Sequence, residues 1–180
     1  FRNPQLARTL EALAQHGGAD FYRGTLARQI LQEMARLQAG DPDFRGWSRS
    51  DLSSYAVLHR QPFCSEQLQH RICTMPPPSS GGLALLQTLA LLNQSTDLAR
   101  SSAADPQTWL QLASAQAWAD ADRLYWVHDP IDGPVPAAAL LDPAYVRSRA
   151  SSMQARPAEA ATPGLPPGID RHPFGRPKKG

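Results

Sequence analysis

The amino-acid sequence predicts a helix-rich α+β fold that contains one short β-hairpin. Three stretches begin with an N-cap residue followed by proline, which is typical of a helix start: Asn3-Pro4, Asp105-Pro106 and Asp142-Pro143. Strand-forming residues gather between about residues 56 and 76, where a tight reversal near Leu68-Gln69 separates two short runs. The hydrophobic content of 42% is ordinary for a globular chain.

Two helices are expected in the first 40 residues. The first begins at Asn3-Pro4, ends at Gly17-Gly18, and carries an apolar stripe made of Leu6, Leu10 and Leu13. A turn is expected at residues 21–24, with its two aromatic side chains anchored in the core. The second helix spans about residues 25–39 and is expected to direct four apolar side chains inward: Leu26, Ile30, Met34 and Leu37.

A third, shorter helix around residues 51–55 is expected to be capped by Ser48 or Ser50. The hairpin near residues 56–76 follows it. If its strands reverse between Leu68 and Gln69, positions 64 and 73 face each other. The sequence therefore predicts that Cys64 and Cys73 lie within bridging distance on one face.

The segment Pro76-Pro-Pro-Ser-Ser-Gly-Gly82 is predicted to be a structural joint before a buried helix. Its prolines Pro76, Pro77 and Pro78 favour an extended backbone, and Ser79 and Ser80 are good N-caps. Gly81 and Gly82 allow a sharp bend or a close approach. Residues 83–92 are nearly all apolar, so this helix is expected to be buried on most sides.

Two further helices are expected after residue 105. A long one carries six large apolar side chains and is the expected hub of the helical layer: Trp109, Leu110, Leu112, Trp118, Leu124 and Trp126. A short one is expected near residues 145–153. Residues 1–154 are thus interpreted as one scaffold portion. Residues 155–180, which are rich in proline and glycine, are interpreted as a tail that does not pack into a core.

Composition argues against several classes of function. The net charge of +2 and the lack of a basic stripe argue against nucleic-acid binding, and no apolar run is long enough to span a membrane. The chain starts at Phe1 and shows no signal peptide, which favours a mature fragment or a trimmed chain. Its only lysines are Lys178 and Lys179. Two explanations stay open: chance in an arginine-rich chain, or last residues that are foreign to the protein.

Three groups of residues are candidates for chemistry. Cys64 and Cys73 suit a disulfide, two buried thiols, or, least well, a zinc site with His59 and His70, which lie at the opposite strand parity. Ser79 and Ser80 are candidates for a nucleophile, but the sequence has no Gly-x-Ser-x-Gly elbow around them, so helix capping is favoured. The backbone N–H groups of Gly81 and Gly82 could bind an anion at the helix start, which is a weaker candidate. Four acidic residues are interpreted as forming ion pairs and turns, with Asp122 beside Arg123: Asp120, Asp122, Asp129 and Asp132.

The segment 76–82 resembles the Pro-Pro-Pro-Ser-Ser-Gly-Gly segment in the large subunit of the γ-glutamyltranspeptidase (glutathione hydrolase) family. Further matches follow in the family's order, at Asn3 with residues 6–10, Phe21-Tyr22-Arg23-Gly24 with Ala27, residues 51–55, Ala121-Asp122-Arg123 and Asp129-Pro130. The sequence departs from the family pattern at Ser114, Asp120 and His128, so a pseudoenzyme stays open as an alternative.

The resemblance implies the later half of a large subunit within the αββα sandwich of an N-terminal-nucleophile hydrolase. It implies glutathione or another γ-glutamyl compound as substrate and an N-terminal threonine as nucleophile on the small subunit. The implied partners are the rest of the large subunit and that small subunit, with no cofactor or metal. Residues 155–180 would lead toward the family's self-cleavage point.

This chain lacks the family's Thr-Thr-His motif, so no catalytic or substrate-binding residue is assigned to it, and alone it is expected to be inactive. The family and the candidate disulfide imply a periplasmic or secreted location. Two rival interpretations are a non-catalytic helical interaction module, with residues 109–126 as its binding face, and a serine hydrolase centred on Ser79 or Ser80.

Overall fold

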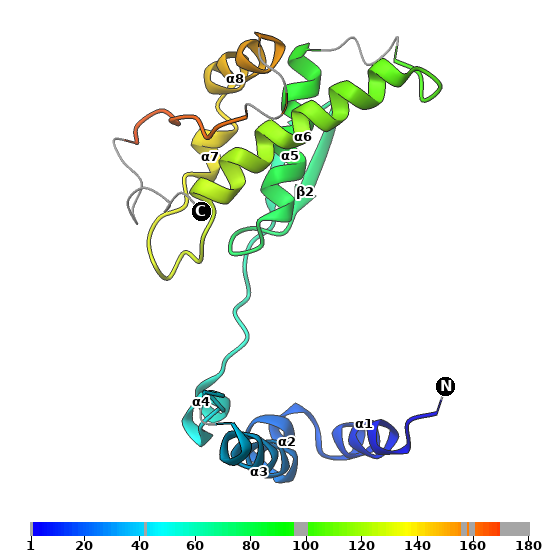
Figure 1. Ribbon diagram of the computed structural model, residues 1–180, viewed down its shortest axis with the longest axis vertical. Coiled ribbons are helices and arrows are strands. Elements are labelled where there is room, and N and C mark those ends of the chain that lie inside the picture. The colour runs from blue at the N-terminus through cyan, green and yellow to red at the C-terminus, as the bar shows by residue number, and fades with distance from the viewer. Residues whose placement is uncertain (1, 42, 96–100, 156–157, 159–160, 170–180) are drawn as a thin grey trace. The chain divides into compact units, whose positions relative to one another are not determined.

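The computed structural model describes residues 2–41, 43–95, 101–155, 158 and 161–169 (Figure 1). Its helices are α1 (Pro4–His16), α2 (Gly18–Arg23), α3 (Thr25–Gly40), α4 (Arg49–Ser54), α5 (Gly81–Ser95), α6 (Pro106–Trp126), α7 (Ala137–Leu140) and α8 (Pro143–Ala155), and its strands are β1 (Phe63–Gln67) and β2 (His70–Thr74). The predicted helix-rich fold with a small two-stranded sheet is confirmed. The chain divides into two compact units, Phe1–His59 and Arg60–Gly180, a division that composition alone did not indicate.

Helix α1 begins and ends where the sequence predicts. The Asn3 side chain accepts a hydrogen bond of 3.0 Å from the Leu6 N–H, and Gly17 at the other end has a φ of 74°, which favours glycine. The predicted apolar stripe, however, finds no core within this unit, because Leu6 and Leu10 are about half exposed. Within the described residues, α1 therefore holds no buried side chain.

The turn expected at residues 21–24 is wrong, because those residues belong mainly to α2. Gly17 ends α1, and a new helix starts at once and runs to Arg23. The Asp20 carboxylate then accepts hydrogen bonds from the N–H groups of Thr25 (2.6 Å) and Leu26 (3.3 Å), so an acidic side chain from α2 caps α3.

Only the start of α3 is buried in this unit. Leu26 is buried as expected, but Leu37, also expected to point inward, is exposed. Ser48 rather than Ser50 caps α4. Its hydroxyl accepts from the Asp51 N–H, and the Asp51 carboxylate accepts from the Ser48 N–H in return.

The predicted hairpin reversal is confirmed. Strands β1 and β2 are antiparallel, with Gln67 paired with His70 and Cys64 paired with Cys73. The two turn residues, Leu68 and Gln69, both have positive φ angles, 52° and 63°.

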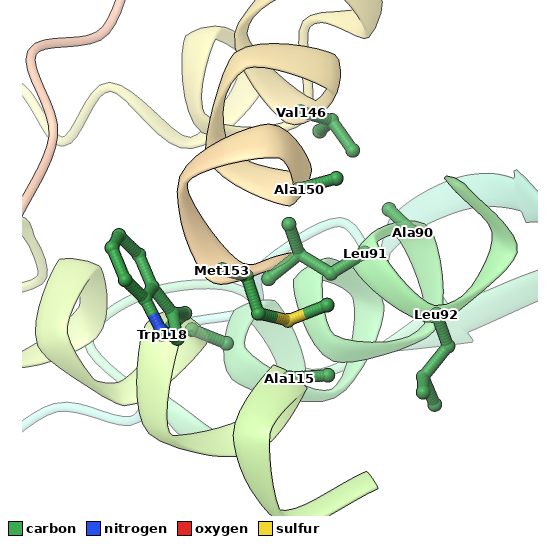
Figure 2. Packing of buried hydrophobic residues seen from close by; sticks show 9 residues of the cluster. Ala90, Leu91, Leu92, Ala115, Trp118, Val146, Ala150 and Met153 are labelled. Carbon is green, nitrogen blue, oxygen red and sulfur yellow. The ribbon is translucent and has the colours of Figure 1, made fainter. Parts of the chain in front are cut away.

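The C-terminal unit is built around α5, which packs against α6, α8 and β1. Side chains from all three helices meet in one cluster, shown in Figure 2: Ala90, Leu91, Leu92, Ala115, Trp118, Ala119, Val146, Ala150 and Met153. A second cluster joins Leu83, Trp126, Leu140 and Tyr145. Helix α5 is thus buried on most sides, as predicted, although Leu85 is exposed.

Helix α6 has two different faces. Trp118 and Trp126 are buried in the two clusters, whereas Trp109, Leu110 and Leu124 are 56–74% exposed. The expectation that this helix is the hub of the helical layer is wrong, because α5 lies at the centre and α6 packs against it through one face only. Helix α7 was not predicted from the sequence.

The expectation that the chain after residue 155 does not pack is wrong for residues 161–169. Pro166 is fully buried, Ala161 packs against the first cluster and Ile169 against the second. The backbone of Gly164 is hydrogen-bonded to both Asp122 and Trp126, which a count of apolar side chains does not reveal. Residues 170–180, including Lys178 and Lys179, lie outside the described residues.

Candidate functional site

The Pro76–Gly82 segment turns sharply before α5 rather than staying extended. The Ser79 N–H donates to the Pro76 carbonyl (3.1 Å), and the Pro77-Pro78 peptide bond is cis. A Cβ atom at Gly82 would lie 2.5 Å from the Met75 carbonyl oxygen. The close approach made by Gly82 therefore joins the end of β2 to the start of α5.

Ser80 immediately precedes α5. Its carbonyl accepts a hydrogen bond from the Ala84 N–H, and its hydroxyl lies 3.3 Å from Arg123 Nη1, which donates to it. Among the described residues, no base accepts a hydrogen bond from this hydroxyl. The geometry at Ser80 therefore suits a helix start that is tied to α6.

The most connected polar group among the described residues is the carboxylate of Asp122, which is fully buried. Its Oδ2 accepts hydrogen bonds from Gln87 Nε2 (2.7 Å), Tyr145 Oη (2.9 Å) and Arg149 Nε (3.1 Å). Its Oδ1 accepts from the Gly164 N–H (2.8 Å) and pairs with Arg149 Nη2 (3.0 Å). The donors come from α5, α8 and the 161–169 segment, so one carboxylate joins four parts of the chain.

Burial governs the electrostatics of this group. It raises the pKa of Asp122 above the ordinary value of 3.8, while Arg149 and the neutral donors act in the opposite direction. Burial, followed by the charge of Asp122, also raises the pKa of Tyr145, so its phenol stays a donor. The Arg149 guanidinium is held in turn by the Trp118 carbonyl (3.1 Å) and lies 4.6 Å from the Trp118 ring centroid.

This arrangement suits cross-linking of the fold rather than bond chemistry. A carboxylate that receives five donor contacts has no oxygen lone pair directed at a substrate. A buried ion pair whose partners are all satisfied instead fixes the relative positions of the segments that supply them. We call this cluster of Gln87, Asp122, Tyr145, Arg149 and Gly164 the carboxylate hub.

The acidic residues after residue 119 play separate parts. Asp120 pairs with Arg123 at 2.7 Å, and Asp129 lies 3.9 Å from Arg60 and accepts from the Ile131 N–H. The expected link between Asp122 and the adjacent Arg123 is wrong, because the two side chains leave α6 on different faces. Sequence reasoning missed the hub, although Trp118, Asp122 and Trp126 recur every four residues on one face, and that spacing marks Asp122 as inward-facing.

The hairpin holds both cysteines and His70. The Cys64 and Cys73 sulfur atoms are joined in a disulfide, and His70 Nδ1 lies 2.7 Å from the Leu68 carbonyl oxygen. Among the described residues, no group of three or more His, Cys, Asp or Glu side chains is arranged to hold a metal ion. Within the same residues, no helix combines the length and the apolar character needed to cross a membrane.

Comparison with known proteins identifies the family. The family model "Gamma-glutamyltranspeptidase" matches residues 1–173. The chain is 33% identical over 162 residues to the glutathione hydrolase proenzyme of Escherichia coli, covering 88% of this chain and 27% of that protein. It is also 33% identical over 153 residues to the oxamate amidohydrolase proenzyme of Klebsiella pneumoniae, covering 85% of this chain and 27% of that protein.

The fold agrees with a solved member of the same family. A γ-glutamyltranspeptidase from Pseudomonas nitroreducens, solved in complex with L-DON, superimposes with a TM-score of 0.78 at 31% identity, covering 92% of this chain and 49% of that chain. The present chain thus spans less than a third of the curated relatives named here. The sequence match and the shared fold together show that this chain belongs to the γ-glutamyltranspeptidase family of N-terminal-nucleophile hydrolases.

Proposed function

We propose that this chain is the scaffold half of the large subunit of a γ-glutamyltranspeptidase, or glutathione hydrolase. The observation that carries the proposal is the family match over residues 1–173, combined with relatives in which the matched part is only 27% of the protein. In the whole protein, we expect these residues to belong to the αββα sandwich. They would pack against the rest of the large subunit and against the small subunit.

The chemistry of the whole protein would then be acyl transfer. A threonine hydroxyl attacks the γ-glutamyl carbonyl with its own α-amine as base, an ester forms, and the amine of the donor leaves. Water or an acceptor amine then takes the γ-glutamyl group. The threonine itself is freed by self-cleavage, which is the net addition of water across one peptide bond to give a carboxylate and the threonine amine.

In the whole protein, this chain would hold other segments in place and would supply no reacting group. Its hub carboxylate is saturated with donors, and within the described residues no base is hydrogen-bonded to the Ser80 hydroxyl, so neither group is set up as a base or as an activated nucleophile. The disulfide of the hairpin supports a periplasmic or secreted location, because such bonds persist in oxidising compartments.

The test compares the isolated chain with the full-length precursor encoded at its own locus. The precursor is expected to contain Thr-Thr-His downstream, to split into two subunits before that threonine, and to release p-nitroaniline from γ-glutamyl-p-nitroanilide. The isolated chain is expected to release none. A precursor that stays uncleaved and inactive would overturn the proposal.

A second substrate class belongs in the same experiment. The 33% identity to an oxamate amidohydrolase proenzyme equals the identity to the glutathione hydrolase, so identity does not separate the two activities. Ammonia release from oxamate by the processed enzyme, without γ-glutamyl anilide hydrolysis, would assign the protein to that class instead.

The rival interpretation as an interaction module depends on the exposed face of α6, formed by Trp109, Leu110 and Leu124. An isolated chain that is monodisperse and soluble, at a locus that encodes no downstream threonine motif, would favour that interpretation.

A further inference from the structure

The segment Ala161–Ile169, here called the strap, is hydrogen-bonded to the rest of the C-terminal unit through its backbone. The Gly164 N–H donates to Asp122 Oδ1 (2.8 Å), and the Gly164 carbonyl accepts from Trp126 Nε1 (2.9 Å). Pro166 is fully buried beyond this point. The strap is thereby held by two backbone hydrogen bonds to α6 and by the buried ring of Pro166, in addition to the contacts of Ala161 and Ile169 with the two apolar clusters.

Gly164 also packs closely against two other partners of Asp122, Tyr145 and Arg149. A Cβ atom at this position would clash with the Tyr145 hydroxyl and lie 2.9 Å from Arg149 Cδ. Tyr145 and Arg149 both donate to Asp122. The strap therefore docks only where the hub is assembled and where residue 164 has no side chain.

We propose that Asp122 is a positioning residue for self-cleavage, an inference that rests on the proposed function above. By holding Gly164, Asp122 fixes the path of the chain that, in a family precursor, leads on to the scissile bond. Asp122 does not touch the reacting atoms. It acts through the strap, and a displacement of about 1 Å at a reacting centre can slow a reaction by roughly 100-fold.

The experiment measures the rate constant of self-cleavage in the full-length precursor by intact-mass spectrometry. Two variants disrupt the hydrogen bond between Asp122 and Gly164, each at one of its two residues. Asp122→Ala removes the acceptor, and Gly164→Ala leaves the acceptor but blocks docking of the strap. Both are expected to slow cleavage by about 10- to 100-fold, and hydrogen exchange of the amides in residues 161–169 is expected to accelerate in both.

Two controls separate positioning from a general loss of stability. Leu92→Ala removes core packing but no hydrogen bond of the hub, and Asp120→Asn removes a half-exposed ion pair on the same helix. Both are expected to cleave within about fivefold of the wild-type rate. Asp122→Asn, which keeps an oxygen acceptor for the Gly164 N–H, is expected to cleave faster than Asp122→Ala.

A further readout uses the molecules that do cleave. Their kcat and KM for γ-glutamyl-p-nitroanilide are expected to match the wild type, because the strap acts before the threonine amine exists. A wild-type precursor that fails to cleave would overturn the proposed function. If the wild type cleaves, the positioning role is overturned when Asp122→Ala and Gly164→Ala cleave at its rate, when Leu92→Ala slows cleavage as much as they do, or when the kcat of their cleaved forms falls.

Discussion

Arg149 and Asp122 form a buried ion pair, with 3.0 Å between Arg149 Nη2 and Asp122 Oδ1 and with 7% and 0% of their side chains exposed. They are 27 residues apart and join α8 to α6. Removing one partner of such a pair leaves an uncompensated buried charge, which costs far more than the intact pair contributes.

We therefore expect Asp122→Asn to lower the free energy of unfolding by about 3–5 kcal/mol. The matched control is Asp120→Asn, two residues earlier, whose pair with Arg123 is partly exposed and is expected to contribute about 1 kcal/mol or less. Urea denaturation followed by circular dichroism measures both. Equal losses for the two variants would show that burial does not set the strength of the Asp122 pair.

Tyr145 is expected to make stability depend on alkaline pH. Its folded-state pKa is raised above the ordinary value of 10.0, first by burial and then by the charge of Asp122. The stabilisation is fully present below the unfolded value and is lost as the pH rises above about 10, where only the unfolded chain releases the proton. At neutral pH, Tyr145→Phe should lower the free energy of unfolding by about 1.5–3 kcal/mol, because it removes a hydrogen bond to a charged group.

The measurement is the difference in free energy of unfolding between the wild type and Tyr145→Phe from pH 7 to pH 11. This difference should shrink above pH 10 by up to about 1.4 kcal/mol per pH unit. A difference that stays constant over the whole range would contradict the raised pKa.

Gly82 and Gly81 offer a paired test of the joint before α5. A Cβ atom at Gly82 would meet the Met75 carbonyl oxygen at 2.5 Å and Thr74 Oγ1 at 2.6 Å, whereas one at Gly81 would meet nothing within 4 Å. We expect Gly82→Ala to destabilise by about 1–3 kcal/mol. Gly81→Ala should be neutral or stabilising by up to about 1 kcal/mol. Thermal denaturation of the two variants measures this difference. Similar melting temperatures would argue against the close approach of Gly82 to the Met75 carbonyl oxygen.

The hairpin disulfide closes a short loop, since Cys73 follows Cys64 at a sequence separation of 9. The chain-entropy estimate for a loop of that size is at most about 2–3 kcal/mol. A thiol reductant is expected to lower the melting temperature of the wild type by the corresponding amount, and the double variant Cys64→Ser/Cys73→Ser should melt at the same temperature with or without reductant. A wild type unaffected by reductant would mean that the hairpin holds without the covalent bond.

Local features of the fold were predictable from the sequence, and the hub was not. The caps at Asn3, Asp105 and Asp142 involve neighbours within three residues, so a short sequence window contains the whole interaction. The hairpin register follows from one reversal point. Asp122, by contrast, finds its partners 23 to 42 residues away, and its sequence neighbour Arg123 points elsewhere.

Two predictions were wrong because they relied on the pattern of apolar side chains alone. The tail after residue 155 was expected not to pack because it has few apolar side chains, yet Gly164 and Pro166 are held by backbone hydrogen bonds and by ring burial. In α1, the stripe of Leu6 and Leu10 has helical periodicity but stays half exposed, since periodicity shows that a face is apolar and not what covers it.

The hairpin turn also has a practical consequence. Leu68 and Gln69 occupy two consecutive left-handed positions, φ 52° and 63°, where an asparagine-glycine pair is preferred. Non-glycine residues lose about 1–2 kcal/mol each in that conformation. The replacement Leu68→Asn/Gln69→Gly is therefore expected to raise the melting temperature, which would make the protein more robust during production.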